Sequence, residues 1–289
     1  MGPSTSLRRS GGIVIRRQKS LTDLQEVPVL DDGCIQPSLK VRFFGHFELL
    51  RSDVPVRLGR NAKALTILKY LLSHRAQPVS RDYLMGWLWP ESNLRRARWS
   101  LSSSIYALRK LLRGEPSSVA SSDYILFDKG HYCLDPTVEV WTDTDEFEAR
   151  YERGRHLEKT QREVEATAEY EEAVELYRGD YLAEDLYEDW TMVEREWFAN
   201  VYMDMLGRLT DYYMKTEQYQ ESIRTCYRLL EKDCCHENSH RLLMECYACL
   251  GLQERALRQY RLYESVLKRI WGRAPHPETR YLYRRLLER

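Results

Sequence analysis

The sequence lacks any long apolar run. Near its start the longest is Ile13–Ile15, whereas a secretory signal needs about seven consecutive apolar residues and a membrane span about 20. The seven cysteines are odd in number and scattered along the chain, which does not suit a disulfide framework. We therefore expect a cytoplasmic protein with no membrane segment.

The motifs of common enzymes are also missing. The chain contains no GxxxxGK[ST] phosphate loop, no GxSxG and no HExxH. Acidic pairs such as Glu171 with Glu172, or Asp185 with Glu188 and Asp189, lie in charge-dense helical stretches, which is typical of a solvated face. We predict that the protein is not an enzyme and binds no cofactor.

The formal net charge is zero, with 44 basic and 44 acidic side chains, but the charges are unevenly distributed. Residues 39–136 hold 16 basic and 8 acidic side chains, whereas residues 137–289 hold 23 and 32. The net charges are therefore +8 and −9, and residues 1–38 add +1. Such asymmetry indicates that one part of the chain binds nucleic acid.

Three segments follow from these patterns and from the spacing of apolar residues. Residues 1–38 have no sustained period, and we expect a disordered tail, with a DNA-contacting arm as the alternative. Residues 39–136 carry alternating short strands, then three helices, then a hairpin over 119–134 with its turn at Asp128–His131. From residue 137 onwards the pattern is almost wholly helical, and Asp143 with Glu146 predicts a capping box at the first helix.

The helical segment repeats with a period of 34 residues. Tyr213 recurs as Tyr247 and Cys226 as Tyr260, while Ser222 recurs as the small residue Ala256. This period is that of tetratricopeptide (TPR) units. The predicted fold is therefore mainly α: an α+β winged helix-turn-helix over 39–136, followed by an all-α TPR-like repeat domain over 137–289.

The third helix of the first domain, residues 92–113, is the strongest functional signal. No acidic residue occurs between Glu91 and Glu115, although solvated helices normally interleave both signs. One narrow stripe is apolar and predicted to be buried: Leu94, Ala97, Leu101, Ile105, Leu108 and Leu112. The opposite face suits the DNA major groove, because arginine pairs with guanine and lysine neutralises phosphate.

We predict DNA contacts from this helix and from the hairpin tip, through Arg95, Arg96, Trp99, Ser102, Ser103, Tyr106, Arg109, Lys110, Arg113, Lys129 and His131. Two alternatives stay open. Arg98 and Arg109 lie nearer the apolar stripe and are equally suited to packing or ion pairing. Trp99 is also placed for a contact between domains or between two copies of the chain.

The chain resembles the antibiotic regulatory protein type of transcriptional activator. The resemblance rests on LKVRFFGHFEL, PVSRDYLMGWLWP, ARWSLSSSIYALRKLL and DKGHYCLD in the first domain, and on ELYRGDYL, ALRQYRLYESVL and HPETRYLYRRLL in the second. It implies DNA binding through the third helix and the hairpin, often as a homodimer on direct repeats, and recruitment of RNA polymerase. His131 stands where the family commonly has glycine.

Two further interpretations compete with this one. The cysteines and histidines of 226–249 (Cys226, Cys234, Cys235, His236, His240, Cys246 and Cys249) include a single C-x-x-C, and zinc sites usually need two half-sites. We expect structural residues there, with zinc as the alternative and no metal site predicted. The alternative overall function is a TPR-like adaptor that binds a protein or an effector, with the winged helix serving dimerisation.

Overall fold

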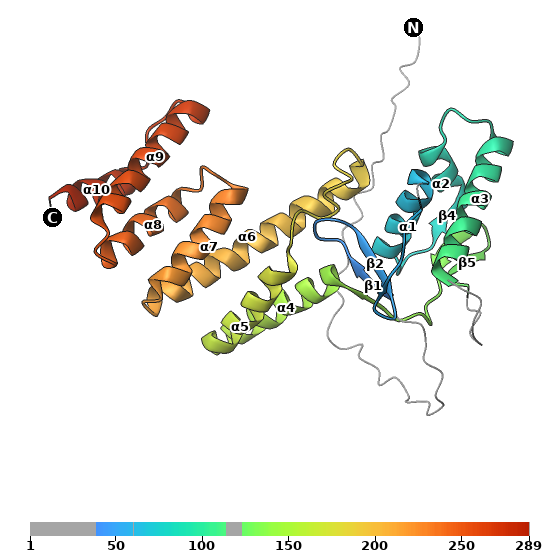
Figure 1. Ribbon diagram of the computed structural model, residues 1–289, viewed down its shortest axis with the longest axis horizontal. Coiled ribbons are helices and arrows are strands. Elements are labelled where there is room, and N and C mark those ends of the chain that lie inside the picture. Colours follow the sequence, from blue (N-terminus) through green and yellow to red (C-terminus); the bar gives the residue numbers. More distant parts are fainter. Residues whose placement is uncertain (1–38, 60, 114–122, 289) are drawn as a thin grey trace, which may run out of the picture. The chain divides into compact units, whose positions relative to one another are not determined.

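The computed structural model describes residues 39–59, 61–113 and 123–288, and Figure 1 shows how their elements follow one another. The first part mixes short strands with three helices, which are β1 (Leu39–Arg42), β2 (Glu48–Arg51), β3 (Val54–Pro55), α1 (Ala62–Ser73), β4 (Val79–Ser80), α2 (Arg81–Leu88), α3 (Leu94–Arg113), β5 (Ile125–Asp128) and β6 (His131–Leu134). The predicted tail of 1–38 and the first residues of the predicted hairpin, 119–122, lie outside the described residues.

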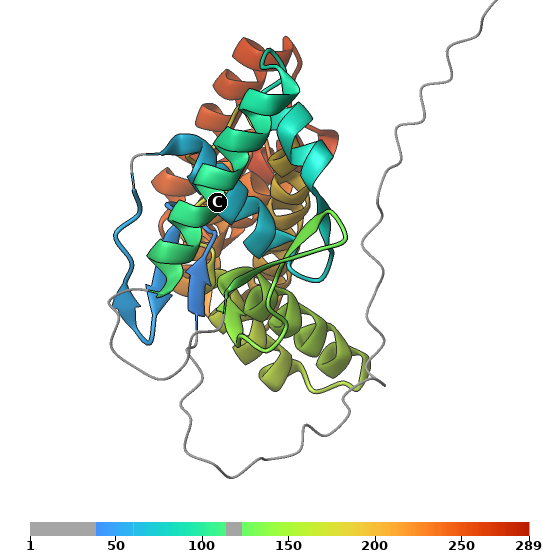
Figure 2. The same cartoon turned by 90° about the vertical axis from the view of Figure 1, so that its right-hand side faces the viewer.

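Two small sheets frame the three helices. One has the order β3-β2-β1-β7, in which β7 is Val140–Thr142, and the other has the order β4-β6-β5. Helix α3 packs against α1 and α2, and Figure 2 shows it, in green, running along one side of this unit. The strands β5 and β6 form the predicted hairpin, which pairs with β4 at the start of α2. This is the winged helix-turn-helix arrangement that the sequence predicted.

Strand β7 (Val140–Thr142) ties the two halves of the chain together. It pairs in parallel with β1, so that Leu39 lies opposite Val140. Phe44 contributes further, because its buried ring contacts Phe147, Tyr177 and Phe198 of the helical half. One continuous apolar core therefore runs from β1 into the helices.

The remaining elements are helical: α4 (Asp143–Lys159), α5 (Glu163–Leu176), the short η1 (Asp189–Thr191), α6 (Met192–Lys215), α7 (Tyr219–Lys232), α8 (Glu237–Cys249), α9 (Gln253–Trp271) and α10 (Pro277–Leu287). Each of α6 to α9 packs against the next helix along the chain. Ser222 and Ala256 are completely buried, as expected for small residues where helices approach closely. The TPR-like prediction is thus confirmed. None of the described helices is long and apolar enough to cross a membrane.

The predicted capping box at Asp143 is wrong. The N-cap of α4 is Thr142, whose hydroxyl accepts a hydrogen bond from the backbone N–H of Asp145. Asp143 is instead buried, and its carboxylate accepts hydrogen bonds from the backbone N–H groups of Phe43 (2.8 Å) and Phe44 (3.0 Å). The side chain that was predicted to cap a helix therefore binds the backbone directly after β1, one hundred residues earlier in the chain.

Candidate nucleic-acid interface

Helix α3 begins with a side-chain cap and carries one buried stripe. The Asn93 side-chain oxygen accepts a hydrogen bond of 2.9 Å from the backbone N–H of Arg96, which satisfies one of the free donors of the first turn. The predicted apolar stripe is buried from Ala97 onwards, and Ser104 is buried with it. The helix is further fixed at its C-terminal end, where Arg51 donates a hydrogen bond of 2.9 Å to the carbonyl of Leu112.

Leu94 departs from the predicted stripe. It is 64% exposed, although the helical spacing placed it with the buried residues. The reason is its position: the helix begins at Leu94, one turn before its first core residue, Ala97. An apolar side chain is therefore presented beside the arginines of the first turn.

The face opposite the buried stripe is open to solvent. Trp99 is 73% exposed and Tyr106 is 72% exposed, and the other exposed predicted residues of α3 are Arg95, Arg96, Ser102, Ser103, Lys110 and Arg113. Arg98 is also exposed, and no ion pair of the described residues includes it. The helix thus presents cationic, hydroxyl and aromatic groups together on one side.

The first turn of α3 is electrostatically unusual. It contains no acidic residue and carries Arg95 and Arg96 at the end where the helix macrodipole is positive. Cations at this end cost about 0.3 to 1 kcal/mol each, whereas an anion there is stabilised. Phosphate groups bind helix N-termini for the same reason. The arrangement therefore favours an external anion at the start of α3.

Two of the predicted contact residues hold the hairpin. The guanidinium of Arg109 donates two hydrogen bonds, of 2.9 and 2.7 Å, to the carbonyl of Ile125 in β5. Arg113 forms an ion pair with Asp123, just before β5. Arg109 is half-buried. Its position near the apolar stripe therefore corresponds to a structural contact, which was one of the two alternatives left open by the sequence.

The hairpin tip presents the other two predicted residues. Lys129 and Gly130 both have positive φ, 46° and 84°, as a tight two-residue hairpin turn requires. Lys129 and His131 are both exposed, and the ring Nδ1 of His131 lies 3.1 Å from the carbonyl oxygen of Lys129. The turn thus points a lysine and a histidine outward from the hairpin that α3 supports.

The cysteines and histidines of 226–249 do not come together as one cluster. Cys226 and Cys246 are buried, whereas Cys234 and Cys249 are exposed, and burial raises the pKa of Cys226 to about 12. The ring of His240 stacks on Tyr263. Within the described part of the chain, no group of three or more metal-ligating side chains is placed to hold an ion.

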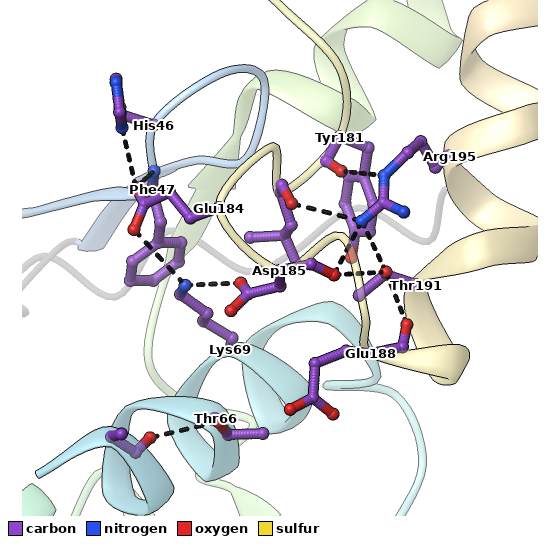
Figure 3. A network of polar contacts seen from close by, with 12 residues as sticks. His46, Phe47, Thr66, Lys69, Tyr181, Glu184, Asp185, Glu188, Thr191 and Arg195 are labelled. Atoms are coloured by element: carbon purple, nitrogen blue, oxygen red, sulfur yellow. Dashed lines mark hydrogen bonds and ion pairs between the residues drawn. The ribbon is translucent and has the colours of Figure 1, made fainter.

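A polar network joins the winged helix to the helical half, and Figure 3 shows it from close by. The Nζ of Lys69 on α1 is 2.6 Å from the carboxylate of Asp185 and 4.0 Å from that of Glu184. Glu184 also accepts a hydrogen bond of 3.0 Å from the backbone N–H of Phe47. Arg195 of α6 donates to the carbonyls of Tyr181, Leu182 and Asp185 and so holds the loop that carries both carboxylates. Spacing in the sequence gives no signal for these contacts.

An open cavity of about 660 Å³ lies on the helical half, lined by Trp141, Glu146, Arg150, Glu171, Glu172, Glu175 and Leu176. Its carboxylates have partners. Glu146 pairs with Arg150 at 2.7 Å, Glu175 pairs with Arg228 at 2.8 Å, and the hydroxyl of Tyr213 donates to Glu171. An effector site on the helical half stays a prediction.

The chain combines a winged helix-turn-helix unit with TPR-like helices. Residues 142–287 match the model of the family described as bacterial transcriptional activator domain. This match spans just over half of the chain, so the chain belongs to that family. This match agrees with the resemblance of the sequence to activators of the antibiotic regulatory protein type.

A solved structure supports the fold. The chain is similar to Mycobacterium tuberculosis EmbR, solved in complex with a low-affinity phosphopeptide, with a TM-score of 0.69 and 22% identity over 88% of this chain. The chain spans 66% of that EmbR chain, slightly less than two thirds of its length. A weaker similarity, with a TM-score of 0.38 and 17% identity, covers 51% of this chain and 92% of a C-terminal TPR-containing domain from Plasmodium falciparum. A comparison with curated protein sequences gives no match.

Proposed function

We propose that this regulator is a sequence-specific DNA-binding activator in which α3 contacts bases in the major groove and the β5–β6 hairpin contacts the adjacent backbone. The observation that carries the proposal is the exposed face of α3, which combines basic and hydroxyl side chains without one acidic residue. A helix that only supported a dimer or a helical adaptor has no need to exclude acidic side chains.

The structure of the unit suggests different roles for the predicted residues. Arg95 and Arg96 in the first turn are suited to guanine edges or to phosphate at the helix N-terminus. Ser102, Ser103, Tyr106 and Lys110 lie further along the same exposed side. Arg109 and Arg113 would act on DNA chiefly through the hairpin that they hold, and Lys129 and His131 at its tip would contact the backbone.

Trp99 and Leu94 are large and apolar beside these charges. Thymine methyl groups offer an apolar partner in the major groove, so both side chains are compatible with DNA. A contact with a second copy bound nearby on the duplex is the alternative for Trp99. RNA polymerase is the proposed partner for activation, because the chain belongs to a family of transcriptional activator domains.

The test uses the full chain and a duplex selected by the protein from a random library. We expect Arg96→Ala to weaken binding by about 5-fold to 150-fold, as for loss of a base contact worth about 1 to 3 kcal/mol. Lys110→Ala should weaken binding to every duplex alike and should lower the salt slope by about one. The matched control is Arg224→Ala, which changes an exposed arginine on α7 whose one ion pair among the described residues is with Glu221.

Binding that is unchanged in both α3 variants, or a wild-type affinity that does not depend on salt, would contradict the proposal and favour the adaptor function. Transcription from a template carrying the selected site then tests the sign of regulation. We expect added protein to increase the transcript made by bacterial RNA polymerase, and a decrease would identify a repressor.

A further inference from the structure

An exposed apolar surface with acidic edges lies at the start of α6 and in the segment just before it. We name it the acidic patch, and it consists of Leu186, Tyr187, Glu188, Asp189, Met192, Val193, Glu194, Glu196 and Trp197. Tyr187 is 98% exposed and Val193 is 74% exposed, and Leu186, Met192 and Trp197 are exposed too. Five large exposed apolar side chains thus lie within twelve residues, and clusters of exposed apolar side chains rimmed by polar ones mark interaction sites.

The carboxylates of the acidic patch form no ion pair with any side chain that the structure describes. They are those of Glu188, Asp189, Glu194 and Glu196. Burial, together with the neighbouring carboxylates Asp185 and Asp189, raises the pKa of Glu188. An approaching cation would relieve this repulsion, so the patch favours a partner that is both basic and apolar.

A surface of that kind is present at the other end of the helical repeat. Residues 253–289 hold ten basic and four acidic side chains, although the helical half as a whole is acidic. At about 100° per residue, one outward face of α9 presents Arg255, Arg258 and Arg269 beside Leu262 and Val266. We name these five residues the basic face. Its three arginines are exposed and belong to no ion pair of the described residues.

The basic face cannot reach the acidic patch of its own chain through the helix packing, because α7 and α8 lie between α6 and α9 in the packing order. We propose that two copies of the chain associate head to tail, with the basic face of α9 in one copy seated on the acidic patch of the other. This surface differs from α3, so the proposal does not depend on DNA binding.

The chemistry favours a second copy over DNA as the occupant. The exposed Leu262 and the half-buried Val266 lie between the arginines and suit an apolar protein surface, and the acidic patch would repel phosphate. The interface is heterologous, because different surfaces meet, so each copy keeps one free surface of each kind for a further copy. With fewer than ten residues a side, it is smaller than the usual 20 to 30, and we therefore expect weak, salt-dependent self-association.

The experiment is sedimentation velocity of the full chain without DNA, from about 5 to 200 μM and at low and high salt. One variant removes the net negative charge of the acidic patch (Glu188→Lys with Glu196→Lys), and a second reverses the net charge of the basic face (Arg258→Glu with Arg269→Glu). We expect the wild type to associate with increasing concentration and each variant to remain monomeric. An equimolar mixture of the two variants should associate again, because the unchanged basic face of the first variant meets the unchanged acidic patch of the second.

The matched control for the acidic-patch variant is Glu152→Lys with Glu231→Lys. It makes the same charge change as that variant, at exposed positions outside both surfaces. It should associate as the wild type does, and circular dichroism checks that every variant is folded. A wild type that stays monomeric up to 200 μM at low salt, or a mixture that fails to recover association, would overturn the proposal. It would also be overturned if the α9 variant lost affinity for DNA while its self-association was unchanged.

Discussion

Removal of Asp185 should destabilise the protein more than removal of Lys69, although both remove the same ion pair. Lys69 is buried, with its side chain only 2% exposed, whereas the side chain of Asp185 is 20% exposed. In Asp185→Asn the ammonium stays buried, and its remaining carboxylate, Glu184, is 4.0 Å away. A buried charge left without its partner costs about 3 to 5 kcal/mol.

Lys69→Met leaves a different situation. Methionine fills nearly the same volume without a charge, and the carboxylate of Asp185 can turn towards water. We expect a cost of about 1 to 2 kcal/mol, mainly from lost hydrogen bonding. The double variant should then be more stable than Asp185→Asn alone, because no buried charge is left unpaired.

The assay is urea unfolding of the full chain at pH 7, followed by tryptophan fluorescence. Trp190 lies close to the network and contacts Tyr70 and Trp87, so the signal is sensitive to this junction. The control is Lys232→Met, which removes a more exposed pair with Asp180 at 2.6 Å and should cost less than about 1 kcal/mol. If Lys69→Met proved the more destabilising of the two single variants, the reasoning from burial would be refuted.

Three further outcomes follow from other contacts. Burial raises the pKa of Asp143 from 3.8 to about 6, so the folded state binds this proton more tightly than the unfolded state does. As the pH rises from 4 to 6, the free energy of unfolding of the wild type should therefore fall by up to about 3 kcal/mol relative to that of Asp143→Asn. Parallel curves of stability against pH for the two proteins would contradict this. Gly154→Ala should lower stability by about 1 to 3 kcal/mol in urea titrations, because a Cβ there would overlap the buried ring of Tyr170; an unchanged midpoint would show that the ring moves aside. A fragment of residues 39–136 should give weak, non-cooperative thermal unfolding, since it lacks β7 and the partners of Phe44; a sharp transition would show an independent domain.

The sequence predicted the elements that depend on local patterns. The third helix was predicted over 92–113 from its apolar spacing and is observed over Leu94–Arg113, and the 34-residue period identified the TPR-like repeat. It failed where distant segments meet. Asp143 looked like a cap but serves β1, and the Lys69 network joins residues more than one hundred positions apart. Such contacts follow from tertiary packing, which leaves no periodic trace in one sequence.

The placement of these distant contacts bears on how the helical half would influence DNA binding. Strand β7 and Asp143 fix β1, while Asp185 and Glu184 fix α1, and α1 packs directly against α3. A partner on the acidic patch would touch residues adjacent in the chain to Asp185. Such a partner would therefore act on the contact of Asp185 with α1, and through α1 on the position of α3. No hinge motion is needed. Coupling of this kind requires that binding at the patch change the stability of the Lys69 pair. We therefore expect self-association at the acidic patch to change the DNA affinity of the wild type more than that of Lys69→Met, when DNA binding is measured at protein concentrations below and above self-association. An equal change in both proteins would place the effect outside this path.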